Sequence, residues 1–151
     1  MHNIIVHAVI KNEKDEYLII KRTLVKRGIY NYEGGKWDIP GGTVEELELP
    51  NRALAREVKE EVGLEITENN IIFETSQIDT QKNQIFTTLI YLCECKSNNR
   101  IKLNLEEHDE YKWLSGNEIL AMKDEDLVSY MKKLIQTLKR ITIKNGSILC
   151  E

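Results

Sequence analysis

One stretch of 23 residues, from Gly42 to Leu64, constrains this chain more than any other: GTVEELELPNRALAREVKEEVGL. Its residues follow the spacing G-x5-E-x7-R-E-U-x-E-E-x-G-U, in which U is aliphatic. Pro50 suits the first turn of a helix, and Gly63 suits the left-handed conformation that often ends one. The stretch therefore predicts a helix that begins near Pro50 and ends before Gly63.

The predicted helix has an apolar face and an acidic face side by side. Glu57, Glu60 and Glu61 fall on one arc, where like charges destabilise a helix by roughly 0.2–0.5 kcal/mol per pair. A solvated acidic surface would explain three glutamates on an arbitrary helix. Three carboxylates on one face also suit Mg²⁺, which prefers oxygen ligands. Aliphatic residues recur on the adjoining face at helical spacing: Leu54, Val58 and Val62.

The complete pattern, with Gly41 directly before it, resembles the Nudix box, and the chain is similar to the Nudix hydrolases, also called the MutT family. The resemblance implies an α+β Nudix fold, with a mixed β-sheet sandwiched between α-helices, and a single domain over residues 1–151. By resemblance, the carbonyl of Gly41 and the three box glutamates bind Mg²⁺, with Mn²⁺ as a substitute. Arg56 is expected to hold these glutamates through charge-assisted hydrogen bonds, and Glu48 to be structural.

A second functional region is expected in residues 105–115, LEEHDEYKWLS. In MutT-like members, a glutamate six residues before a tryptophan serves as a further metal ligand or general base. Trp113 assigns this role to Glu107. We expect His108 to be exposed and to have no role. The neighbouring acidic residues remain alternatives to Glu107: Glu106, Asp109 and Glu110.

The loop of residues 22–36 is rich in arginine, lysine, tyrosine and glycine. In the family, the corresponding region often lies over the substrate. Arg22 and Arg27 are therefore candidate ligands of substrate phosphate, and a solvated basic loop is the alternative. Other residues of the loop are also candidates for contact with phosphate or base: Lys26, Tyr30 and Tyr32.

Strands are expected on both sides of the box helix. Residues 3–10 and 17–21 form apolar runs around a polar turn, which predicts a hairpin. Residues 71–79 and 85–94 follow the box helix as longer strands. The second is apolar on both faces and therefore predicts a central strand. A turn is expected at residues 98–100.

The C-terminal part is expected to be helical and then to form a ribbon. Ser115 and Glu118 match a capping box and predict the start of a short helix. Apolar residues between Leu127 and Leu138 recur at helical spacing. Asn145-Gly146 is a hairpin signal, so residues 139–151 are expected to form an extra C-terminal ribbon.

Composition excludes several classes of protein. The net charge of −4 gives no reason to expect a nucleic-acid or membrane surface. No apolar run reaches membrane-spanning length, and the N-terminus does not follow the pattern of a secretory signal. The three cysteines favour reduced thiols and a cytoplasmic protein. We expect a monomer or a homodimer.

The resemblance implies hydrolysis of a diphosphate linkage in a nucleoside diphosphate derivative. ADP-ribose pyrophosphatases often carry a proline downstream of the box, where this chain has Thr80. Such absences favour a nucleoside triphosphate pyrophosphohydrolase. Hydrolases of ADP-ribose, nucleotide sugars or dinucleoside polyphosphates remain alternatives. A non-catalytic module that senses nucleotides is a further alternative, from a different functional class.

Overall fold

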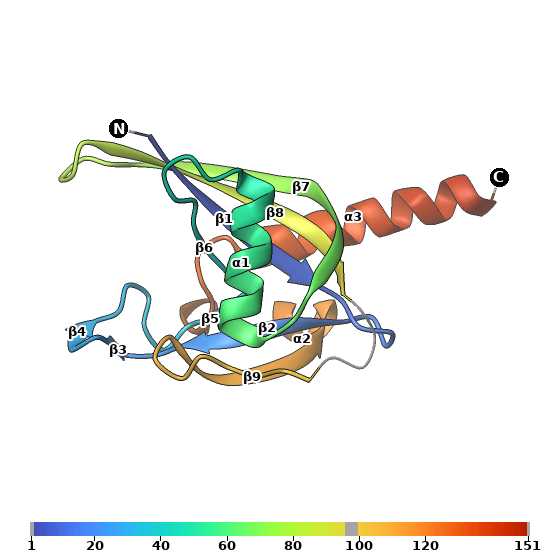
Figure 1. Ribbon diagram of the computed structural model, residues 1–151. Helices are drawn as coiled ribbons and strands as arrows, with labels where there is room; N and C mark the ends of the chain where they lie inside the picture. Colours follow the sequence, from blue (N-terminus) through green and yellow to red (C-terminus); the bar gives the residue numbers. More distant parts are fainter. Residues whose placement is uncertain (1, 96–99, 151) are drawn as a thin grey trace.

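The computed structural model describes residues 2–95 and 100–150, so most of the turn expected at residues 98–100 lies outside the described residues (Figure 1). Its strands and helices follow one another in this order: β1 (His2–Ile10), β2 (Glu16–Arg22), β3 (Val25–Lys26), β4 (Ile29–Tyr30), β5 (Trp37–Asp38), β6 (Gly41–Thr43), α1 (Pro50–Val62), β7 (Ile66–Asp79), β8 (Gln84–Cys95), β9 (His108–Ser115), α2 (Gly116–Leu120), a 3₁₀ turn η1 (Asp124–Asp126) and α3 (Met131–Cys150).

The strands form two main sheets and one small hairpin. The larger sheet has the order β6-β1-β8-β7, in which β1 and β8 run parallel and the other pairs are antiparallel. The second sheet has the order β5-β2-β9, and β3 pairs with β4. Strand β8 lies inside the larger sheet, which confirms the expected central strand.

The hairpin predicted for the first two strands is wrong beyond its turn. Lys11 and Tyr17 form a single isolated bridge, after which β1 and β2 enter different sheets. The polar turn still closes as expected, because the Asn12 side chain accepts hydrogen bonds from the backbone N–H groups of Lys14 and Glu16. Local turn chemistry thus forms the corner, whereas distant partners determine the sheets.

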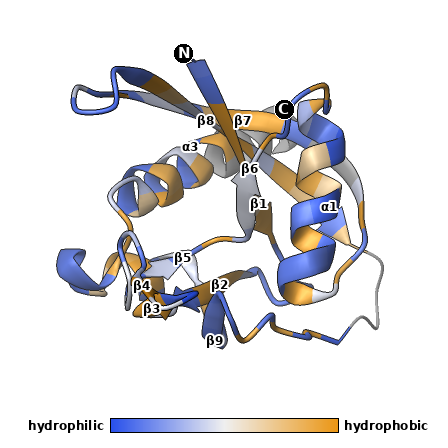
Figure 2. Cartoon of the chain, turned by 60° about the vertical axis from the view of Figure 1, so that its left-hand side comes forward, coloured by the Kyte–Doolittle hydropathy of each residue, from blue (hydrophilic) through white to orange (hydrophobic). Residues whose placement is uncertain are grey.

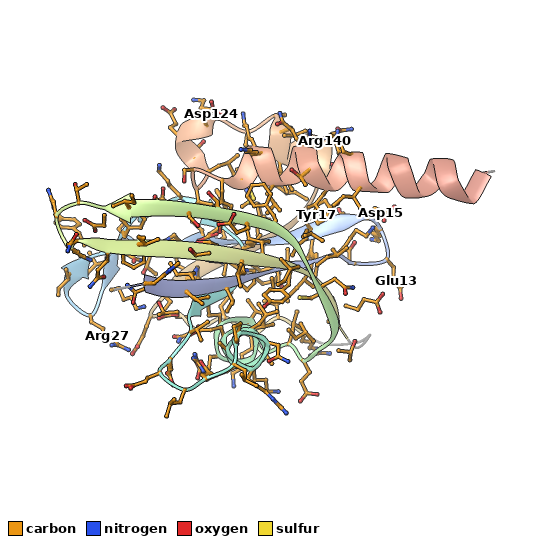
Figure 3. The ribbon with its side chains drawn as sticks, turned by 90° about the horizontal axis from the view of Figure 1, so that it is seen from above. Glu13, Asp15, Tyr17, Arg27, Asp124 and Arg140 are labelled. Atoms are coloured by element: carbon orange, nitrogen blue, oxygen red, sulfur yellow. The ribbon has the colours of Figure 1, made fainter. Side chains whose placement is uncertain are left out.

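Helices α1 and α3 cover opposite sides of the strands (Figure 3). Both helices carry hydrophilic and hydrophobic residues along their length (Figure 2). Alternate residues of β1 and β2 supply two separate cores, so the strands are covered from both sides. This mixed sheet between helices confirms the expected α+β fold. The core beneath α1 includes Val6, Ala8, Leu18, Ile20, Leu54, Val58 and Val62, and the core beneath α3 includes Val9, Ile19, Ile90, Met131, Leu134 and Leu138.

The C-terminal region differs in one respect from the expectation. The capping box is confirmed, since the Ser115 side chain accepts from the Glu118 N–H and the Glu118 carboxylate accepts from the Ser115 N–H. Helix α3, however, continues to Cys150, so the ribbon predicted for residues 139–151 is wrong over 139–150, and residue 151 lies outside the described residues. The Asn145-Gly146 turn signal is overridden by continuation of the helix. None of the helices in the described residues is both long and apolar enough to cross a membrane.

Candidate active site

Helix α1 carries the box glutamates, and its ends are those that the sequence predicts. Pro50 lies in its first turn, and Gly63 ends it in the left-handed conformation with φ 74°. The aliphatic stripe is buried against β1 and β2, which fixes the rotation of the helix about its axis. As a result, Glu57 and Glu61 face a cavity, whereas Glu60 lies on the exposed side.

Arg56 is the centre of a carboxylate network on α1. Its Nε and Nη2 donate to the two carboxylate oxygens of Glu48 at 2.8 and 2.9 Å. Its Nη1 donates to Glu57 Oε1 at 2.8 Å and lies 3.4 Å from Glu60 Oε2. The hydrogen bonds from Arg56 lower the pKa of Glu48 to about 2. Arg56 thus contacts two of the box glutamates, and Glu48 anchors the other side of its guanidinium group.

Gly41 and Gly42, at the start of β6, lie directly against the glutamates. The backbone N–H of Gly41 donates to Glu61 Oε2 at 2.9 Å. A side chain at Gly42 would overlap the carboxylate of Glu57, and one at Gly41 would overlap the Val6 carbonyl oxygen. The two glycines are therefore required for close approach of strand β6 to both α1 and β1.

The segment before β9 brings Glu107 to the end of α1. The backbone N–H of Asn104 donates to the Glu61 carbonyl at 2.9 Å, and the Asn104 carbonyl accepts from the N–H groups of Glu107 and His108. Glu61, Glu107 and His108 each offer a ligand atom, and these atoms lie within 4.8 Å of one another. Lys26, from the β3–β4 hairpin, forms an ion pair with Glu107 Oε1.

The carboxylates of this cluster have perturbed proton affinities. Burial, followed by the negative charges of neighbours that include Glu57 and Glu107, raises the pKa of Glu61 well above its usual value. Burial likewise raises the pKa of Glu57. Burial also acts to raise the pKa of Glu107, but the hydrogen bond and charge of Lys26 outweigh it and leave that pKa lowered. Burial lowers the pKa of His108 to about 4.

The cluster fits a divalent cation. Glu61 is only 4% exposed, and its carboxylate accepts from a backbone N–H. A buried carboxylate is costly unless it is paired or coordinates a metal. The Nδ1 atom of His108 is buried and has no hydrogen-bond partner in the described residues. Oxygen and nitrogen donors with these properties are typical of metal sites in proteins.

A cavity of about 570 Å³ opens beside this cluster. Part of its lining is polar: Asp38 accepts a hydrogen bond from the Tyr130 hydroxyl and forms a 3.2 Å ion pair with Arg22. His7 also lies there, and its Nδ1 donates to the Ile39 carbonyl at 2.8 Å. The lining residues come from both sheets, α1, the loop of residues 22–36, the segment before β9 and the chain leading into α3. They include Ile5, His7, Arg22, Lys26, Tyr32, Asp38, Gly41, Gly42, Glu57, Glu61, Phe73, Phe86, Glu107, His108 and Tyr130.

The two arginines expected at the substrate lie in different surroundings. Arg22 lines the cavity, but three of its nitrogens donate within the protein: Nε to the Tyr32 carbonyl, Nη1 to Asp38 and Nη2 to the Asn31 side chain. It therefore ties the loop to the cavity wall. Arg27 lies in the turn between β3 and β4, at the edge of the molecule, and is not among the cavity-lining residues (Figure 3).

The remaining expectations divide in the same way. Lys26, Tyr32 and Glu107 line the cavity, whereas Tyr30 is 88% exposed. The acidic alternatives to Glu107 are exposed: Glu106, Asp109 and Glu110. His108 is the residue that sequence reasoning missed, because it is 4% exposed instead of solvated. The local sequence gives no signal for this burial, because the adjacent Asp109 and Glu110 are exposed and the burial follows from pairing with β2.

Comparisons with known proteins agree with this arrangement. A family model described as NUDIX domain matches residues 1–138. A nucleoside triphosphatase NudI of Klebsiella pneumoniae (strain 342) is 32% identical over 152 residues, which cover 96% of each chain. NudI of Escherichia coli (strain K12) is 35% identical over 83% of this chain and 85% of its own.

Solved structures show the same fold. The crystal structure of a MutT protein from Methanosarcina mazei Go1 matches with a TM-score of 0.76 and 29% identity, over 93% of this chain and 95% of its own. A MutT NUDIX hydrolase from Burkholderia pseudomallei matches in fold with a TM-score of 0.74 and 22% identity, over 91% of this chain and 98% of its own. With the box, the fold and the family model in agreement over most of its length, the chain belongs to the NUDIX domain family.

Proposed function

We propose that this chain is a Mg²⁺-dependent nucleoside triphosphate pyrophosphohydrolase. The observation that carries the proposal is the proximity of Glu61 and Glu107 beside Gly41 of β6, at the edge of a cavity of about 570 Å³. That volume is in the range of small-molecule sites, roughly 300–1,000 Å³. The relatives named nucleoside triphosphatase support the substrate class, and a Proteus vulgaris 8-oxo-dGTP diphosphatase is 31% identical over 49% of this chain and 65% of its own.

The proposed metal ligands are the Gly41 carbonyl and the carboxylates of Glu57, Glu60, Glu61 and Glu107. The contact of Glu107 with Glu61 and the burial of Glu61 support two of these. Glu60 belongs to the set by the family pattern, although its carboxylate is 56% exposed and lies near Arg56. A bound Mg²⁺, or Mn²⁺ in its place, neutralises phosphate charge and lowers the pKa of bound water.

In this proposal, some side chains orient the metal ligands and one carboxylate acts as the general base. Arg56 keeps Glu57 oriented through the 2.8 Å hydrogen bond, with Glu48 bracing its other side. One carboxylate, either Glu107 or a box glutamate, accepts the proton of the attacking water. Water then adds to phosphorus as the bridging P–O bond breaks, which releases a nucleoside monophosphate and pyrophosphate. Such transfers depend mainly on positioning and electrostatics.

Aromatic residues of the cavity lining support a site for the nucleoside. Tyr32, Phe73 and Phe86 provide aromatic surface for stacking. Arg22 is proposed to act on the substrate through the loop that it holds, because three of its nitrogens already donate to protein oxygens.

Cys93 and Cys95 are free thiols, which supports the proposed cytoplasmic location.

A panel of nucleotides with Mg²⁺ and product analysis tests the proposal. The expected result is conversion of at least one nucleoside triphosphate to its monophosphate and pyrophosphate. Glu61→Gln should lower turnover by orders of magnitude, because a neutral amide is a poor Mg²⁺ ligand, whereas Glu46→Gln, on the exposed segment before α1, is the matched control. Cleavage of only ADP-ribose, nucleotide sugars or dinucleoside polyphosphates would replace the substrate class. Nucleotide binding without hydrolysis would instead indicate a sensing module.

A further inference from the structure

Beside Glu61 and Glu107, two of the proposed metal ligands, lies the buried imidazole of His108. His108 is 4% exposed, and one of its ring nitrogens lies within 4.8 Å of ligand oxygens of Glu61 and Glu107. Its Nδ1 is buried without a hydrogen-bond partner in the described part of the chain. Buried polar atoms of native proteins are nearly all hydrogen-bonded, so an exception indicates an unfilled interaction.

Main-chain contacts hold His108 in place. Its backbone N–H donates to the Asn104 carbonyl at 3.0 Å, and its main chain pairs with Arg22 next to a register shift in the β2–β9 ladder. His7, the other buried histidine of the cavity, differs because its Nδ1 donates to the Ile39 carbonyl. The main chain therefore holds the His108 ring beside the carboxylates, while the ring itself keeps an unused nitrogen.

The donor set of the cluster distinguishes between classes of cation. Mg²⁺ is a hard ion that prefers oxygen ligands and retains several waters. An imidazole nitrogen favours borderline first-row transition ions, which bind mixed nitrogen and oxygen sites more tightly. We infer that His108 is a nitrogen ligand beside Glu61 and Glu107, so that this site binds a divalent transition ion through His108 in addition to accepting Mg²⁺ through its carboxylates. The inference rests on the proposed function for the location of the metal, but it concerns the ion and its ligand.

Spectroscopy of the Mn²⁺-loaded wild-type protein tests the inference without a substitution. Electron spin echo envelope modulation should show ¹⁴N coupling to Mn²⁺, and growth on ¹⁵N-histidine should replace it by ¹⁵N coupling. His108→Gln should remove the histidine-derived coupling. His2→Gln, at an exposed histidine that contacts Thr87, should leave it unchanged. Absence of histidine coupling in the wild type, or its persistence in His108→Gln, would overturn the inference.

Binding measurements give a second and independent readout. Isothermal titration with Co²⁺ should show about a tenfold or greater loss of affinity in His108→Gln, since even ligand-supporting residues contribute on the order of 10–100-fold. Affinity for Mg²⁺ should change by less than about threefold, because imidazole adds little to a hard ion. Equal losses for both ions would contradict the assignment. Thermal melting of each variant checks that the fold is intact.

These results are separable from the proposed function. Mg²⁺-dependent hydrolysis by a wild-type protein that lacks histidine coupling would leave the function standing and remove the role of His108. Histidine coupling in a protein that hydrolyses no nucleotide would do the reverse.

Discussion

Alanine at Gly41 and at Gly42 should damage the protein in different ways, although the two glycines are neighbours in β6. A Cβ at Gly41 would overlap the Val6 carbonyl oxygen and the His7 ring, both on the adjacent strand β1. A Cβ at Gly42 would overlap the carboxylate of Glu57. The first obstacle includes backbone in a sheet, whereas the second is the end of a flexible side chain. The first substitution should therefore destabilise the fold and the second should disturb the site.

The magnitudes follow from what must move. In Gly41→Ala, β6 has to withdraw from β1, where the Ala8 N–H donates to the Pro40 carbonyl at 2.8 Å. Overpacking of this kind costs about 1–3 kcal/mol, and a weakened backbone hydrogen bond adds about 1 kcal/mol. A total of about 2–4 kcal/mol corresponds to a melting temperature lower by roughly 5–15 °C in a chain of this size. In Gly42→Ala, rotation of Glu57 relieves the overlap, and loss of its hydrogen bond to Arg56 costs about 1 kcal/mol.

Thermal melting and steady-state hydrolysis, measured on both variants, check this reasoning. Gly42→Ala should melt within a few degrees of the wild type, because the melting temperature changes by roughly 2–4 °C per kcal/mol. Its turnover should fall about 100-fold, because Glu57 is displaced from Arg56. Gly41→Ala should show the large loss of stability. The reasoning is refuted if Gly42→Ala keeps full activity, or if it is destabilised as strongly as Gly41→Ala.

Four further predictions each concern one residue or a matched pair. Arg56→Lys should lower turnover at least about tenfold, because lysine cannot bind Glu48 through two nitrogens while holding Glu57; unchanged kinetics would contradict this. The pKa of Glu48 is lowered from 4.5 to about 2 in the folded chain, so its stabilising effect is complete above pH 4.5 and is lost as the pH falls toward about 2. In Glu48→Gln, the free energy of unfolding from denaturant titration should depend less on pH within this window. Glu107→Gln should impair hydrolysis and the exposed Glu110→Gln should not, and the opposite order would move the assignment. Burial raises the pKa of the Cys93 thiol to about 12, so mass spectrometry should find Cys93 protected from iodoacetamide at pH 8 and alkylated only after unfolding.

The box helix was predictable because all of its determinants are local. The first-turn Pro50, the aliphatic stripe and Gly63 fix its limits and rotation within one stretch of chain. The same stretch indicates which glutamates face the cavity once the buried side is known. Family spacing led to Glu107, and the structure brings this residue against Glu61.

The sheets were less predictable because their partners lie far apart in sequence. Strand β1 pairs with β6 and β8, and β2 pairs with β5 and β9, although the turn between them is a good hairpin turn. The burial of His108 follows from the same long-range pairing. Its polar neighbours in the sequence had instead indicated an exposed residue. At Asn145-Gly146, a local turn signal was overridden by the continuing helix α3.

The cluster of Glu61, Glu107 and His108 joins two parts of the chain that fold around different sheets. Glu61 comes from α1, which packs on the larger sheet, and His108 begins β9 of the second sheet. These residues lie far apart in the sequence, so an unfolded chain brings them together only at the entropic cost of closing a long loop. An ion that binds all three residues can therefore bind only the folded chain. By mass action, it raises the stability of both sheets together, so saturating metal should shift thermal unfolding of the entire described fold and not of the site alone.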